Sequence, residues 1–307
     1  MGERKHQVKH SCSTRAKKLK TMGTSSIYGG SPNGGSQINP LIPADFEDYE
    51  SNDIDDENES NEGVVENEDP ANDNIEDSID LNEQDTSEEY SVNWTNAKSF
   101  MSKVASGKSN NIGGALSRYV KAHGGAKSAS RNSVGGIRTT INLGNFVKNV
   151  SEQGLKETLD QYKIDYRDKS TKEILSELIN ILAPAPDTKD DAIARKSLIL
   201  TMEILYDLID NENLDIESIE NLDLNIIIPS YMETYIYQKL INDLGSRIEN
   251  NSKSAAEAVR LESEIREYIH SKIEIIFKGK EIENYIFSTK EVLKLYNQCY
   301  TVMEDLL

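Results

Sequence analysis

Residues 254–276 read SAAEAVRLESEIREYIHSKIEII, and this stretch decides the class of the fold. Ser254, followed three residues later by Glu257, is a capping box, which is typical of a helix N-terminus. The apolar side chains after it recur every three or four residues and therefore share one helix face: Leu261, Ile265, Ile269, Ile273 and Ile276. We predict a long amphipathic helix here, the longest in the chain, that ends near Gly279 and buries this face against other elements.

Similar helix starts surround this stretch. Ser170–Glu173 and Ser288–Glu291 are further capping boxes, and Asp187–Asp190 resembles another start. Pro184 and Pro186 are expected to stop the helix that begins after Ser170.

The same region carries further apolar stripes at helical spacing. Pro229 fits the first turn of a helix, and Cys299 is expected to be a small core residue. Residues 151–307 are predicted to form four or five helices packed as a bundle, so the fold class is mostly α. The stripes are Ile174, Leu175, Leu178, Ile181 and Leu182; Ile193, Leu200, Ile204 and Leu208; and Met232, Ile236, Leu240, Leu244 and Ile248.

Charge divides the remainder of the chain into blocks. The net charge of −19 combines a basic leader, residues 1–21, with seven Lys/Arg and one acid, and an acidic stretch, residues 45–90, with 21 acids and no Lys/Arg. Residues 95–150 carry nine Lys/Arg and no acid. The protein therefore places a strongly acidic segment beside a basic one.

Composition predicts the organisation of the front of the chain. Residues 22–43 are rich in Gly, Ser and Pro and are expected to be a flexible tail. Residues 44–93 form an acidic linker, expected to be disordered and to act as a solvated spacer or as a decoy for a basic surface. Residues 94–150 mix helical runs with glycine pairs, which predicts short helices with a basic outer face.

Several classes of site are not indicated. The two cysteines, Cys12 and Cys299, lie far apart, and no Cys/His spacing is typical of a metal centre, so we expect no metal or other cofactor. No apolar run is long enough to span a membrane, and residues 1–21 lack the apolar core of a signal peptide. We therefore expect a cytoplasmic protein that does not contact membranes.

Catalytic motifs are also not found. Gly107-Lys108-Ser109 resembles the end of a nucleotide-binding loop, but that motif needs a glycine where this chain has Ser102. Neither His123 nor His270 belongs to a known catalytic pattern. We expect the protein not to be an enzyme.

The basic stretch 95–150 is the candidate binding surface. Three occupants remain open: an acidic surface of a partner protein, the chain's own acidic tract, or nucleic acid bound through its phosphates. A nucleic-acid-binding accessory module is thus the alternative to a protein-docking one. The docking candidates are Arg118, Tyr119, Lys121, Arg131 and Arg138.

An ordered set of short phrases resembles the QatB family, the helical accessory proteins of the four-component Qat anti-phage system. The resemblance covers residues 22–43 and 94–277. The phrases are MGTSSIYGG (22–30), LIP (41–43), SFMS (99–102), GALSRYV (114–120), SASRNSVGGIR (128–138), LAP (182–184), AR (194–195) and QKLINDLG (238–245).

The resemblance implies three kinds of partner: an ATPase, a TatD-like nuclease and a QueC-like enzyme. QueC-like enzymes activate the carboxylate of a 7-deazaguanine with ATP and pass it to an amine. In this family the amine is expected to be the N-terminal glycine of the QatB-type protein, which corresponds to Gly23 after Met22. The protein would then be an adaptor and a protein substrate.

The chain departs from the family pattern at its front, because residues 1–21 precede Met22. Three starts stay open: translation from Met22, removal of the leader, or loss of Met1 to expose Gly2. Gly23 is therefore the candidate modification acceptor and Gly2 its competitor. An α-amino group, with a pKa of about 7.7–8.0, is partly neutral in cells, unlike a lysine at about 10.4.

Overall fold

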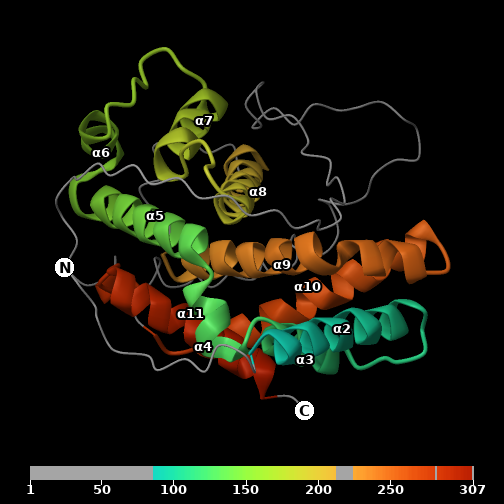
Figure 1. Cartoon of the computed structure of the whole chain (residues 1–307). Helices are drawn as coiled ribbons and strands as arrows, with labels where there is room; N and C mark the ends of the chain where they lie inside the picture. The colour runs from blue at the N-terminus through green and yellow to red at the C-terminus, as the bar shows by residue number, and fades with distance from the viewer. Residues whose placement is uncertain (1–85, 212–223, 281, 306–307) are drawn as a thin grey trace, which may run out of the picture.

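The computed structural model describes residues 86–211, 224–280 and 282–305, which form ten α-helices, one short 3-10 helix and no strand (Figure 1). The predicted mostly-α fold is confirmed for this part of the chain. The leader, the tail and residues 44–85 of the linker lie outside the described residues. The helices are α2 (Thr86–Ala105), α3 (Ile112–Ala122), α4 (Gly125–Arg131), α5 (Val134–Gln153), α6 (Leu155–Gln161), α7 (Thr171–Leu182), α8 (Lys189–Asn211), α9 (Leu224–Asn251), α10 (Ala255–Phe277), η2 (Ile282–Asn284) and α11 (Thr289–Glu304).

The helix boundaries follow the local signals closely. Helix α8 is capped one residue later than expected, because Thr188 Oγ1 rather than Asp187 accepts the N–H of Asp191, at 3.1 Å. Gly124 and Gly279, with φ of +82° and +77°, follow α3 and α10 in the left-handed region that favours glycine. The predicted serine caps, whose hydroxyl accepts the N–H of the glutamate three residues on, are confirmed at Ser170, Ser254 and Ser288.

Helix α9 corrects two expectations. It begins at Leu224, so Pro229 lies inside the helix and not in its first turn. With 28 residues it is also longer than α10, which has 23. A proline inside a helix removes one backbone hydrogen bond. Burial of Ile227 and Ile228 in the core favours continuation of the helix on the N-terminal side of the proline.

The apolar stripes of α9 and α10 are buried as predicted, except that Ile276 is half-buried and Phe277 takes the core position beside it. Two other stripes differ from the prediction, the one in α7 at a single position and the one in α8 at two. In α7, Ile181 is 38% exposed. In α8, Leu200 and Ile204 are half-buried, and the buried face passes instead through Leu198, Ile199, Met202 and Leu205. The side chain of Leu208 lies outside the described residues.

Two small polar residues on the buried face of α8 explain why the apolar pattern did not identify that face. Ser197 and Thr201 are both buried, with their hydroxyls bonded to the carbonyls of Ile193 and Ser197 at 2.7 and 2.8 Å. A hydroxyl whose hydrogen bond is made within the helix can be buried at little cost. Hydropathy treats serine and threonine as polar, so the predicted stripe left these two positions out. It passed instead through apolar residues at the edge of the buried face of α8.

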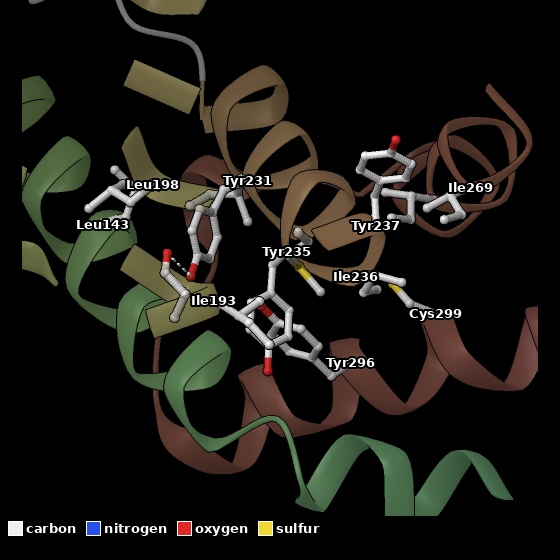
Figure 2. Close-up of a cluster of buried hydrophobic side chains, with 14 of the residues drawn as sticks. Leu143, Ile193, Leu198, Tyr231, Tyr235, Ile236, Tyr237, Ile269, Tyr296 and Cys299 are labelled. Carbon is white, nitrogen blue, oxygen red and sulfur yellow. Dashed lines mark hydrogen bonds between the residues drawn. The ribbon is translucent and has the colours of Figure 1, made fainter. Parts of the chain in front are cut away.

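Helix α9 is the central element of the fold. It packs against α2, α5, α8 and α10, while α11 packs against α3, α4, α5 and α10 (Figure 1). Figure 2 shows Tyr235 of α9 beside Tyr296 of α11, with ring centroids 5.6 Å apart and the rings nearly perpendicular. Cys299 is buried in the same cluster, as predicted, and burial raises the pKa of its thiol to about 12.

The basic stretch and the predicted bundle share one hydrophobic core. Met101, Leu116 and Phe146 belong to the same buried cluster as Leu240 and Ile265. The boundary expected at 150/151 falls inside α5, and α2 begins at Thr86, within the linker expected to run to residue 93. Helices α2 to α5 are thus part of the bundle and not a separate preceding segment.

Replacing Ile265 with Asp should lower the free energy of unfolding by several kcal/mol, on the order of 3–5, because a carboxylate would be buried without a partner. Ile265 is 0% exposed, whereas Ile275 on the same helix is 58% exposed. Ile275→Asp is the matched control and should change stability little. Urea denaturation of both variants checks this, and equal midpoints would show that α10 faces the other way.

Candidate functional site

A buried charge cluster lies where α4, α5, α8 and α9 meet. Lys239 Nζ lies 2.7 Å from Asp190 Oδ1 and donates to the carbonyl of Asn132 at 2.5 Å. The Tyr235 hydroxyl donates to Asp190 Oδ1 at 2.6 Å, and the backbone N–H of Gly135 donates to Oδ2 at 2.7 Å. The two charged side chains are only 9% and 21% exposed. One carboxylate thus joins α5, α8 and α9.

The glycine pair beside this cluster allows close packing. A Cβ on Gly135 would lie 2.8 Å from the carbonyl oxygen of Asp190, and one on Gly136 would lie 2.6 Å from the Tyr235 ring. Ser133, one residue before α5, bonds to the Ala129 carbonyl at 2.9 Å. The family-like phrase at residues 128–138 is therefore explained by packing, because any side chain at the glycines would separate the helices.

A second polar cluster joins α2, α3, α8 and α9. The His123 ring lies between Trp94 and Tyr119, at centroid distances of 4.9 and 4.7 Å. The Tyr119 hydroxyl donates to Asp243 Oδ2 at 3.0 Å, and Lys189 Nζ lies 3.7 Å from Oδ1. His123 Nε2 is 3.5 Å from Oδ2, too long for a well-formed hydrogen bond.

The contacts around Asp243 perturb its titration. Burial by itself raises the pKa of this carboxyl, but the neighbouring His123, the Tyr119 hydroxyl and Lys189 together hold the pKa below its ordinary value. The ionised form is therefore the one that the folded protein favours. This cluster holds the middle of α2 and the end of α3 against α8 and α9.

The five docking candidates do not share one exposed surface. Tyr119 is 1% exposed and belongs to the core. Arg118 is half-buried, stacked 4.0 Å above the Phe100 ring, and Lys121 is half-buried on the same helix. Arg131 on α4 and Arg138 on α5 are exposed, and Arg138 lies 3.3 Å from Asp191. Of the five, Arg131 and Arg138 present the most accessible charge.

A groove of about 580 Å³ lies between α9 and α10 and was not anticipated from the sequence. Its polar floor is Glu233, with Arg266 Nε 3.3 Å from Oε1 and His270 Nδ1 2.6 Å from Oε2. Glu233 and Arg266 are each 12% exposed, so their charges are largely matched within the groove. Apolar side chains, among them Ile226 and Ile275, line part of the remainder beside charged ones such as Glu267, Glu274 and Lys278, which suits a partner side chain with both apolar and polar atoms.

Within the described ranges, no group of three or more His, Cys, Asp or Glu side chains is placed to hold a metal ion. No helix among those described combines the length and apolarity needed to cross a membrane.

Replacing Lys239 with Met should cost about 3–5 kcal/mol of stability, because Asp190 would keep a buried charge without its ionic partner. Lys196 is exposed on α8, so Lys196→Met makes the same change of charge and shape at the surface. Thermal and urea unfolding of the two variants are the measurements. A Lys239→Met protein as stable as Lys196→Met would show that the buried pair contributes nothing.

The lowered pKa of Asp243 predicts a pH dependence with a definite sign. The pKa of Asp243 in the folded protein lies below its unfolded value of about 3.9. The ionised carboxylate therefore contributes its full stabilisation above that unfolded value, and this stabilisation is lost as the pH falls through the native pKa. Asp243→Asn should therefore destabilise the protein near pH 7, and by progressively less as the pH falls below about 3.9. Urea midpoints across this range test it, and a constant difference from wild type would contradict the assignment.

The two polar clusters lie largely in a part of the chain that matches a known protein family. A family model described as "Qat anti-phage system associated protein QatB" matches residues 124–306, which run from the residue before α4 to two residues past the end of α11. Searches of curated proteins and of solved structures each found no match. The phrases at residues 22–30, 41–43, 99–102 and 114–120 lie outside the matched range. Because the match spans more than half of the chain, the protein belongs to the QatB family of the Qat anti-phage system.

Proposed function

We propose that this protein is a non-catalytic adaptor of the Qat system that presents its own N-terminus as a substrate to a QueC-like enzyme. Membership of the QatB family supports a role beside the other Qat components, including the ATPase and the TatD-like nuclease. The phrase that begins at Met22 supports Gly23 as the acceptor.

The observation that carries this proposal is the distance in sequence between Gly23 and the helical body. Helix α2 begins at Thr86, so 62 residues, 24–85, separate the acceptor from the first described helix. A chain of that length can reach at most about 200 Å when fully extended. The terminus can therefore enter an enzyme pocket while the helical body is bound elsewhere on the same partner.

The chemistry of the acceptor fits this role. The neutral α-amine of Gly23 attacks the carbonyl carbon of the ATP-activated 7-deazaguanine carboxylate. A C–N bond forms, the activating group leaves with the electron pair of its bond, and the amine loses one proton. Glycine has no Cβ, so the backbone of the terminal residue can approach a deep pocket closely.

The body would supply the docking surface. Its candidate contacts are the exposed charges of Arg131 and Arg138 and the groove between α9 and α10. A partner that binds through the groove would bury apolar side chains of its lining, so its affinity would depend less on salt than binding through several phosphates does. Binding of nucleic acid through several phosphates would instead weaken steeply as salt increases.

Co-expression with the QueC-like partner, followed by mass spectrometry of the N-terminal peptide, tests the acceptor. Wild-type protein should carry the mass of an amide-linked 7-deazaguanine on Gly23, whereas Gly23→Ile should carry none, because a bulky residue blocks methionine removal and pocket entry. Gly29→Ala and Gly34→Ala are controls that leave the acceptor intact and should remain modified.

The same spectra identify the true terminus, since a mass addition on Gly2 would move the acceptor to the competing site. An unmodified Gly23 and Gly2 in cells that are fully protected from phage would overturn the substrate role.

A further inference from the structure

A basic groove of about 270 Å³ runs between α4 and α11. Four cations line it: Lys127 and Arg131 from α4, and Lys290 and Lys294 from α11. All four are exposed, and no acidic residue is among the side chains that line the groove. Lys280 lies at its edge and donates to Gln298, another lining residue, at 3.0 Å.

Helical spacing explains why the cations converge. Lys127 and Arg131 are four residues apart on α4, and Lys290 and Lys294 are four apart on α11, so each pair occupies one helix face. Half-buried Leu293 gives the groove an apolar floor between them. Four like charges on facing helices repel one another, so an anionic occupant would relieve that repulsion.

The chain's own acidic tract, defined here as residues 45–85, joins the body near this groove. Trp94 of α2 packs against His123, which ends α3, and α4 begins two residues later. Thr86 lies eight residues before Trp94, which is about 12 Å from it towards the N-terminus of α2. The antiparallel α2–α3 pair thus directs the end of the tract towards the part of the body that carries α4 (Figure 1).

We propose that the acidic tract binds back onto the α4–α11 groove and covers it. The tract carries 19 Asp/Glu and no Lys/Arg, so almost any register offers carboxylates to the four cations. It also contains Ile75, Ile79 and Leu81, which can contact the apolar floor. Tethering holds the tract at an effective concentration on the order of millimolar, which compensates for weak individual charge contacts.

The contact gives the tract a regulatory role. While it occupies the groove, it shields the most concentrated positive charge on these two helices from other polyanions. An acidic partner must then displace it to bind there. This role is separate from modification of Gly23, because the contact needs neither the enzyme nor a free N-terminus.

Carbodiimide cross-linking of the full-length protein tests the proposal, since this reagent joins a lysine to a carboxylate only where the two touch. The monomer is digested with a protease that cuts at acidic residues, because the tract contains no Lys/Arg. We expect Lys127, Lys290 and Lys294 to be linked to residues 45–85, and exposed Lys163 and Lys196 not to be. The links should be lost in 1 M salt, where charge interactions are screened within about 3 Å.

A matched pair of variants isolates the groove charge. Lys127→Gln combined with Arg131→Gln should lower the yield of tract links to Lys290 and Lys294 to the level of Lys163 and Lys196 in the wild type. Lys163→Gln combined with Lys196→Gln changes the net charge equally and should leave those links unchanged.

Three results would overturn the proposal. The first is an even distribution of links over all exposed lysines. The second is a monomer fraction without tract links, the links being found only in a cross-linked dimer that joins isotope-labelled to unlabelled chains, which would assign the groove to a second copy. The third is tight binding of a fluorescent single-stranded oligonucleotide by the full-length protein with tract links at the control level, which would assign the groove to nucleic acid.

Discussion

The buried ion pair between Asp190 and Lys239 is the constraint on which the arrangement of the bundle depends. Removing two charges from water is costly, so such a pair is stable only when the remaining polar atoms are also bonded. Here the N–H of Gly135, the hydroxyl of Tyr235 and the carbonyl of Asn132 complete the set. The helices must approach closely to make these contacts, and Gly135 and Gly136 are the residues that permit it.

Three of the short phrases that resemble the QatB family, at residues 114–120, 128–138 and 238–245, meet in space, although they lie far apart in sequence. Residues 128–138 contact Lys239, and Tyr119 of the phrase at 114–120 bonds to Asp243. Lys239 and Asp243 are one helical turn apart in the phrase at 238–245. These phrases therefore belong to the two polar clusters that fix α9 against α3, α5 and α8, and they reflect the packing of the helical body more directly than a binding surface.

The fold determines where the charged blocks of the sequence meet the helical body. The basic residues of α4 and α11 converge on one groove, while the acidic residues of 45–85 are attached to the same end of the body by α2. In the proposed contact, the acidic tract of the same molecule would occupy this cationic groove. The long segment before α2 would then serve two purposes, since it carries the proposed acceptor glycine at its far end and a polyanion nearer the body.

The sequence by itself determined the helical class, the serine caps and the buried faces of α9 and α10, because these depend on residues three or four positions apart. It also indicated the family through ordered phrases. Tertiary structure alone decided the burial of Tyr119, the inclusion of α2–α5 in the shared core, and the position of Pro229 inside α9. Each of these depends on contacts between residues distant in sequence. The groove between α4 and α11 belongs to the same class, since its four cations come from segments about 160 residues apart that only packing brings together.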